Sequence, residues 1–406
     1  MKFTQRGLFS LILAFIVPFF ADAQYFYTPP LLAPYVENAP EINSRAVVLI
    51  DSETGALIYS KNPDEEIPPA SLTKLMTMHL LMKEIETGMA SYDEIVPITV
   101  ESWAQRQPYR SSLMFLEPGQ IVTLREILLG LAVSSGNDAA VAAALWFAPS
   151  VNDFASVMTA EARRLGLNVT RFTEPSGISH ENMTTAAEFA FFCYQYIRLH
   201  PRSLKDFHSA PFFSYPMSAN IPENSRRNLQ TITQYNRNTL LRTFPGVDGL
   251  KTGYIEESGY NVALTAERDK TRFIAVILGA ESIADRAADG TRLLTWAFDN
   301  FKTVRPVIGH IENARLWKGR ADTVELTLAW PADFTSPVNR SSSLRYETYI
   351  PDPLIAPLHP GFPAGYLIIS DEYGELSRVP LVTVNFYERG NIFKRIWHSI
   401  LLLFKN

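Results

Sequence analysis

The chain has 406 residues, a length that favours two domains over a single core. Hydrophobic residues make up 47% and charged residues 19%, which is typical of a globular protein, and no repeat or low-complexity tract is present. The net charge of −5 gives no reason to expect nucleic-acid binding, and the single cysteine, Cys193, excludes an intramolecular disulfide.

The N-terminus has the pattern of a secretory signal peptide over residues 1–23. A basic start precedes an apolar run from Leu8 to Phe20 and the small residues Ala21–Ala23, so we expect cleavage before Gln24. The apolar run is short and contains a proline, which disfavours an uncleaved membrane anchor. The proline-rich residues 24–43 predict an extended lead-in. The mature protein is therefore expected to work outside the cytoplasm.

A first domain is expected over residues 44–306, and a hairpin of strands 45–51 and 55–60 opens it. The segment Ser71–Lys74 follows two prolines, which stop any upstream helix and put the serine in a first helical turn. Positions three apart share a helix face, so the Ser71 hydroxyl and the Lys74 amine are within reach of each other. Lysine can accept the serine proton if burial or a neighbouring cation keeps its amine partly neutral. The pair therefore predicts a nucleophile and its base.

Two further motifs follow in the same domain. Ser135–Asn137 is expected in a short loop between helices Glu126–Val133 and Asp138–Phe147. Lys251–Gly253 is expected to begin a strand that leads into a second strand, Asn261–Ala266. The order S-x-x-K, S-x-N, K-T-G is that of the penicillin-recognising serine acyl-enzymes.

The residues around these motifs strongly resemble the D-alanyl-D-alanine carboxypeptidases, which are low-molecular-mass penicillin-binding proteins. The resemblance runs from about Arg45 to the C-terminus, and the segments that carry it are Ala70–Lys74, Ser111–Leu116, Ser135–Ala139 and Asp248–Gly253. It implies an α/β (α+β) fold of the β-lactamase/transpeptidase type for the catalytic domain, followed by a small all-β domain and a C-terminal amphipathic helix. It also implies a serine peptidase that removes the terminal D-alanine from peptidoglycan stem pentapeptides and is inhibited covalently by β-lactams.

By this resemblance, three residues carry the chemistry. Ser71 attacks the carbonyl between the two D-alanines, and Lys74, held neutral near the cation of Lys251, takes the serine proton. Ser135 passes that proton to the departing amine. Asn137 holds the substrate backbone and helps to position the lysine base.

The resemblance also implies the substrate-binding groups. Lys251 and Thr252 bind the terminal carboxylate, and Gly253 lets the substrate lie close to its strand. Arg237 matches an arginine near the carboxylate end, and the oxyanion hole is formed by the backbone N–H groups of Ser71 and Tyr254.

Two positions depart from the family pattern. Tyr254 stands where relatives often have histidine, and Glu281 stands near an expected arginine. An acid there weakens carboxylate binding unless its side chain points away. Arg286 is a candidate to compensate.

The end of the chain predicts two more parts. A helix over Ala287–Thr303 closes the first domain, and residues 307–387 show short alternating strands typical of a β-rich domain. Residues 388–406 predict an amphipathic helix with isoleucines every fourth residue and cations opposite. We expect this helix to lie on the periplasmic face of the inner (cytoplasmic) membrane; packing against the protein itself is the alternative.

Three other functions compete with the carboxypeptidase. A DD-endopeptidase that cuts peptidoglycan cross-links differs only in its leaving group. A β-lactamase needs fast deacylation, but its E-x-x-L-N pattern is absent and Glu174–Gly177 is only a superficial substitute. A catalytically idle wall-associated scaffold would not need the intact motifs. The histidines show no metal-ligand spacing, and no cofactor is expected.

Overall fold

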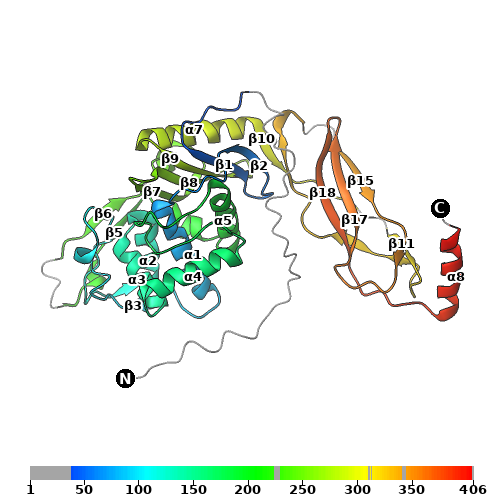
Figure 1. Ribbon diagram of the computed structural model, residues 1–406, viewed down its shortest axis with the longest axis horizontal. Helices are drawn as coiled ribbons and strands as arrows, with labels where there is room; N and C mark the ends of the chain where they lie inside the picture. The colour runs from blue at the N-terminus through cyan, green and yellow to red at the C-terminus, as the bar shows by residue number, and fades with distance from the viewer. Residues whose placement is uncertain (1–37, 224–228, 310, 312, 341–343, 405–406) are drawn as a thin grey trace, which may run out of the picture.

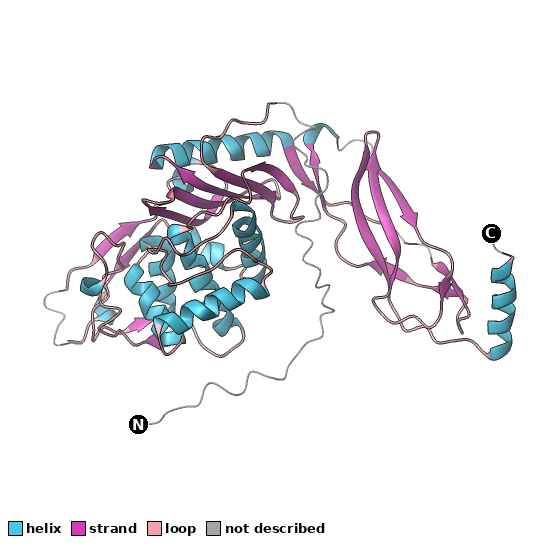
Figure 2. Cartoon of the chain, viewed as in Figure 1, coloured by secondary structure: helices cyan, strands magenta, loops and turns pink. Residues whose placement is uncertain are grey.

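The computed structural model of the protein describes residues 38–223, 229–309, 311, 313–340 and 344–404 (Figure 1). The expected signal peptide, residues 1–23, and the lead-in as far as residue 37 lie outside this described part. Figure 2 shows a mixed part with helices on both faces of a sheet, a β-rich part and a C-terminal helix. The expected fold class is confirmed by this architecture and by the solved relatives reported below.

A central antiparallel sheet organises the first part of the chain. Its strands are β1 (Ala46–Asp51), β2 (Leu57–Lys61), β7 (Val247–Ile255), β8 (Gly259–Arg268) and β9 (Thr271–Ala280). They lie in the order β2-β1-β9-β8-β7, so β1 pairs with β9, a strand more than 200 residues later. The expected opening hairpin is confirmed as β1 and β2.

Alternation along the central strands sends side chains to two separate cores. On β9, Phe273, Ala275 and Ile277 belong to one apolar cluster. The residues between them, Ile274 and Val276, belong to the other. Successive side chains of a strand point to opposite faces, so both faces of the sheet must be covered.

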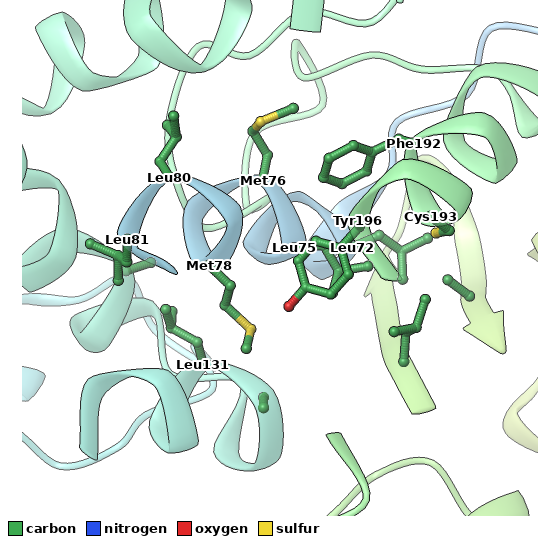
Figure 3. Packing of buried hydrophobic residues seen from close by; sticks show 14 of the residues in the cluster. Leu72, Leu75, Met76, Met78, Leu80, Leu81, Leu131, Phe192, Cys193 and Tyr196 are labelled. Carbon is green, nitrogen blue, oxygen red and sulfur yellow. The ribbon is translucent and has the colours of Figure 1, made fainter. Parts of the chain in front are cut away.

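A group of helices covers one face, and α7 (Ile283–Asn300) covers the other (Figure 1). The first group consists of α1 (Lys74–Glu86), α2 (Leu124–Leu129), α3 (Asn137–Phe147), α4 (Val151–Arg164) and α5 (Ala186–Leu199). Figure 3 shows buried side chains of α1, such as Met76, together with Leu131 and Phe192 from neighbouring elements. Cys193 of α5 is fully buried there, as expected, and burial raises the pKa of its thiol.

Short elements complete this part of the chain. The helical turns are η2 (Ala70–Thr73), η3 (Ala104–Arg106), η4 (Gly130–Ser134), η5 (Leu204–His208), η6 (Ser218–Asn220) and α6 (Leu240–Thr243). Two small hairpins are formed by β3 (Ile95–Val96) with β4 (Val122–Thr123), and by β5 (Phe212–Tyr215) with β6 (Ile232–Tyr235).

The limits of the closing helix differ from the expected 287–303. Ser282 caps α7 by accepting a hydrogen bond of 3.0 Å from the backbone N–H of Asp285, so the helix begins at Ile283. The helix ends at Asn300, because residues 301–304 form a strand that pairs with residues 334–337. Strand pairing with a distant segment therefore overrides the helical pattern.

The β-rich part contains several small sheets around one apolar cluster. Its strands are β10 (Phe301–Val304), β11 (Ala314–Trp317), β12 (Thr323–Val324), β13 (Leu326–Leu328), β14 (Phe334–Pro337), β15 (Arg345–Tyr349), β16 (Leu354–Ile355), β17 (Pro363–Asp371) and β18 (Gly374–Thr383), with the turn η8 (Val338–Arg340). The buried carboxylate of Asp51 accepts hydrogen bonds from Thr303 (2.7 Å) and Thr335 (2.9 Å). Strands β1, β10 and β14 are thus tied together by one side chain.

The last helix, α8 (Ile392–Leu403), lies at the far end of the β-rich part (Figure 1). Within the described part of the chain, no single helix is long and apolar enough to cross a bilayer. Only α3 and α4 together satisfy the length and composition needed, and they are bent by 86°.

Candidate active site

Ser71 and Lys74 lie at the point where the chain enters α1. Ser71 belongs to the tighter turn η2, and Lys74 is the first residue of α1. The lysine Nζ lies 3.2 Å from the serine Oγ, within hydrogen-bond distance. The nucleophile and base predicted from their spacing are therefore in contact.

The environment of Lys74 favours a neutral amine. Its side chain is fully buried, and its Nζ also donates to Asn137 Oδ1 (2.8 Å) and to the backbone carbonyl of Ser176 (2.5 Å). Burial lowers the pKa of Lys74 to about 7, against opposing carboxylates such as Glu174, and the charge of Arg237 lowers it further. Burial, one of the two causes expected from the sequence, is thus the main one.

The second motif lies on an unusual backbone turn. Ser135 adopts left-handed angles (φ 59°, ψ 35°) directly after the π-helical turn η4, which leaves its side chain facing the same cavity as Ser71. Asn137 is the first residue of α3 and not part of the expected loop. Its Nδ2 donates to Ser111 Oγ (3.2 Å), so Asn137 connects Lys74 to the Ser111 segment.

Asp138 holds that neighbouring segment in place. Its buried carboxylate accepts hydrogen bonds from the backbone N–H groups of Met114 (2.8 Å), Phe115 (2.8 Å) and Leu116 (3.0 Å). This explains why a charged residue follows Asn137 inside a buried helix: it satisfies three N–H groups that would otherwise be unpaired.

The third motif lies in the middle of β7 and not at its start, because β7 pairs with β8 from Val247 to Ile255. Lys251 is almost completely buried, which lowers its pKa well below the usual value, and the charges of Lys74, Arg237 and Arg286 lower it further. Gly253 packs on the turn η2: a Cβ added there would lie 2.9 Å from the Ser71 backbone nitrogen. Only glycine permits this approach of β7 to the serine.

These motifs meet at a cavity of about 500 Å³. Its lining includes Ser71, Ser135, Thr252, Gly253 and Tyr254. Lys74, Asn137 and Lys251 are buried and do not line it. The hydroxyl-bearing residues Ser71, Ser135 and Thr252 therefore line the cavity, while the amine of Lys74 contacts Ser71 from within the protein.

Of the two residues that depart from the family pattern, Tyr254 lies at the cavity and Glu281 does not. Tyr254 is half exposed at the cavity, with its ring centroid 4.4 Å from that of Tyr260. Glu281 is exposed and does not line the cavity. Arg286 lines it, with a side chain only 7% exposed, and donates to the Asn261 carbonyl at 3.3 Å. Arg237 also lines it.

Sequence reasoning missed the role of the 174–177 loop. The Ser176 carbonyl accepts from Lys74, 102 residues earlier. The Glu174 carboxylate accepts from the backbone N–H groups of Ser176 (2.7 Å) and Gly177 (2.6 Å), so it holds the loop. No local pattern signals a backbone carbonyl as a ligand. Among the described residues, no group of His, Cys, Asp and Glu is arranged to hold a metal ion.

Comparisons with known proteins agree with this geometry. The profile of the family described as D-alanyl-D-alanine carboxypeptidase matches residues 34–282. D-alanyl-D-alanine carboxypeptidase DacC of Escherichia coli is 30% identical over 373 residues, which cover 90% of this chain and 90% of that protein. A D-alanyl-D-alanine endopeptidase of Pseudomonas aeruginosa is 28% identical and covers 72% of this chain and 88% of its own.

Two solved structures extend the comparison. Penicillin-binding protein 5 of Haemophilus influenzae superposes with a TM-score of 0.79 at 28% identity, covering 87% of this chain and 99% of that one. Penicillin-binding protein D2 of Listeria monocytogenes in its ampicillin-bound form has a TM-score of 0.55 at 25% identity, covering 64% of this chain and 100% of that one. The chain therefore belongs to the D-alanyl-D-alanine carboxypeptidase family of serine peptidases.

Proposed function

We propose that this protein removes the terminal D-alanine from peptidoglycan stem pentapeptides through an acyl-enzyme on Ser71. The observation that carries the proposal is the contact between the Ser71 hydroxyl, exposed to the cavity, and the buried amine of Lys74. A scaffold that only binds the wall has no need of a lysine held near neutrality, because such burial costs stability.

Acylation begins with the attack of Ser71 Oγ on the carbonyl carbon between the two D-alanines. Lys74 accepts the serine proton, and Ser135 passes a proton to the departing amine. The N–H groups of Ser71 and Tyr254 stabilise the oxyanion. Asn137, anchored by Lys74 and Ser111, holds the substrate backbone.

The released D-alanine carries the carboxylate that identifies this substrate. Thr252 and Arg237 line the cavity, and the buried Lys251 precedes Thr252 in β7 and donates to the Thr252 backbone carbonyl at 3.1 Å. Arg286 joins them, since its buried guanidinium has only one hydrogen bond among the described residues. Thr252, Arg237 and Arg286 bind the terminal carboxylate, and the charge of the buried Lys251 contributes from behind them, while Gly253 lets the peptide lie along β7.

The close packing of Gly253 gives a direct test of the oxyanion geometry. We expect Gly253→Ala to slow acylation roughly 10- to 100-fold, because the new methyl group pushes β7 away from the Ser71 nitrogen. The acylation rate with penicillin is the measurement. Gly309→Ala is the matched control, since a Cβ there meets nothing within 4 Å. An unchanged rate in Gly253→Ala would contradict the proposed role of this strand.

Penicillin mimics the acyl donor and remains bound to Ser71. The Glu174 carboxylate is occupied by the backbone of its own loop, so it does not supply the hydrolytic base of a β-lactamase. We therefore expect β-lactams to act as covalent inhibitors.

A DD-endopeptidase is the second candidate, because one relative carries that name and the chemistry differs only in the leaving group. The assay that separates the two is D-alanine release from a diacyl-L-Lys-D-Ala-D-Ala peptide against cleavage of a purified cross-linked muropeptide. Release of D-alanine supports the carboxypeptidase. Cleavage of the cross-linked muropeptide without D-alanine release would show that the protein is an endopeptidase and not a carboxypeptidase.

The protein works at the periplasmic face of the inner membrane, after export by the signal sequence of residues 1–23 and with residues 388–406 on the lipid surface. The support lies in the orientation of α8. His398 is 8% exposed, and its Nδ1 accepts the backbone N–H of Lys318 at 2.8 Å. Lys394 pairs with Asp322 at 2.8 Å on the same side. The polar side of α8 thus contacts the β-rich part of the protein, at Lys318 and Asp322.

The other side of α8 is apolar and uncovered within the described part of the chain. Phe393 is 81% exposed, Trp397 59% and Leu403 80%. A helix with this division of its faces lies in the interface of a bilayer.

We expect replacing both Ile396 and Trp397 by glutamate to weaken binding to phosphatidylglycerol vesicles at least tenfold, because apolar area is lost and negative charge is gained. Vesicle co-sedimentation measures the binding. Val307→Glu is the charge control, since this exposed residue lies far from α8 in the chain. Equal sedimentation of wild type and variant would exclude α8 as the anchor.

A further inference from the structure

The cavity holds more positive charge than one substrate carboxylate requires. Four arginines line it, and no aspartate or glutamate does; they are Arg110, Arg237, Arg242 and Arg286. Within the described residues none of the four forms an ion pair with an acid. The chain as a whole has a net charge of −5, so this concentration of cations is local. Such a field attracts anionic ligands into the cavity.

Two of the arginines belong to the terminal-carboxylate end. The charges of Arg237 and Arg286 both lower the pKa of Lys251, so these residues lie close to it. A carboxylate has two oxygens and about four lone-pair sites. Thr252 and these two arginines are enough to satisfy it. Arg110 and Arg242 are therefore not needed to bind the terminal carboxylate, and Arg242 lies only five residues after Arg237, in α6.

Arg110 stands on a different wall. It directly precedes Ser111, whose Oγ accepts from Asn137 Nδ2, and Ser112, whose carbonyl accepts the Asn137 backbone N–H at 2.7 Å. In the proposed function Asn137 holds the backbone of the acyl part of the substrate. Arg110 thus lies next to that part and not to the leaving D-alanine.

The conformation of Arg110 also distinguishes it. Its φ is 65°, a left-handed backbone that is unfavourable for a residue with a Cβ. Its side chain is exposed, with the guanidinium 5.4 Å from the centroid of the Tyr109 ring. A glycine would adopt this backbone more readily, but it would remove the arginine that lies beside the Ser111–Ser112 segment of the cavity lining.

We propose that Arg110 binds a second carboxylate, carried by the side chain of the residue that precedes D-Ala-D-Ala. The substrate class is then a stem peptide with an anionic acyl part, as opposed to one with a neutral or cationic side chain. This inference rests on the proposed carboxypeptidase function and names its preferred substrate. An exposed arginine–carboxylate pair of this kind changes affinity modestly and is screened by salt.

The experiment uses two peptides that differ by one carboxylate: diacetyl-L-Lys-D-Ala-D-Ala and its counterpart with diacetylated meso-diaminopimelate in place of lysine. We expect the wild type to prefer the anionic peptide roughly 3- to 10-fold in kcat/KM, with a smaller preference at high salt. Arg110→Gln should remove the preference. Arg106→Gln is the matched control, since it removes an exposed charge four residues away that does not line the cavity.

The outcomes separate the two proposals. Release of D-alanine from both peptides at equal kcat/KM, or a preference that survives in Arg110→Gln, overturns the inference about Arg110 and leaves the carboxypeptidase standing. Release from neither peptide by the wild type overturns the proposed function, and the inference that rests on it falls with it.

Discussion

Replacing Ser71 by alanine is expected to abolish D-alanine release from diacyl-L-Lys-D-Ala-D-Ala, with kcat reduced by roughly 10⁴- to 10⁶-fold. No neighbouring group replaces the lost Oγ, since the amine of Lys74 is buried and does not line the cavity. The same variant is expected to lose covalent labelling by a fluorescent penicillin. D-alanine release is measured with residues 24–387, which exclude the signal sequence and α8.

The substitution removes one oxygen atom at a partly exposed position, so the fold should survive. The thermal unfolding midpoint, compared with that of the wild type, shows whether it does. A folded Ser71→Ala protein that still releases D-alanine would remove Ser71 as the nucleophile. Wild-type protein that is labelled by penicillin but releases no D-alanine would leave the endopeptidase as the better account.

The pH dependence of acylation is expected to report the pKa of Lys74. The lysine works as a base only when its amine is neutral, and its pKa lies at about 7 in the folded protein. The acylation rate should therefore rise with pH, about tenfold per pH unit below 7, and level off above it. At an ordinary lysine pKa of 10.5, only about one amine in a few thousand would be neutral at pH 7.

Single-turnover acylation by penicillin, measured between pH 5 and pH 10, isolates this step from deacylation. Lys74→Met should slow it by roughly 10³-fold or more and remove the rise near pH 7. An acylation rate that keeps rising up to pH 10 would show that Lys74 has its ordinary pKa. A rise near pH 7 that persists in Lys74→Met would assign the base to another group.

The contact between Ser71 and Lys74 could be predicted from the sequence because it depends on local geometry. Ser71 and Lys74 are three residues apart, and any helical turn brings such positions to the same face. The hairpin of β1 and β2 could also be predicted from the sequence, since its apolar pattern and turn residues are local. The family pattern then supplied the remaining motifs, although they are 64 and 180 residues from Ser71.

The tertiary structure decided the state of these groups. The side chain of Lys74 is buried, and its amine contacts Asn137 of α3 and the 174–177 loop; no sequence pattern predicts that burial. Lys251–Gly253 lies in the middle of β7 because pairing with β8 extends the strand beyond its local signal. Helix α7 ends at Asn300 for the same reason, since β10 pairs with β14.

The tertiary structure also decided which of two nearby charged residues faces the cavity. Glu281 and Arg286 are five positions apart, yet only Arg286 lines the cavity. On α8, the contact of His398 with Lys318 turns the apolar side outward. Local sequence thus determined which chemical groups the protein carries, because those depend on residue type and short spacing. Their ionisation, burial and direction depend on segments far apart in the chain, so only the folded protein decides them.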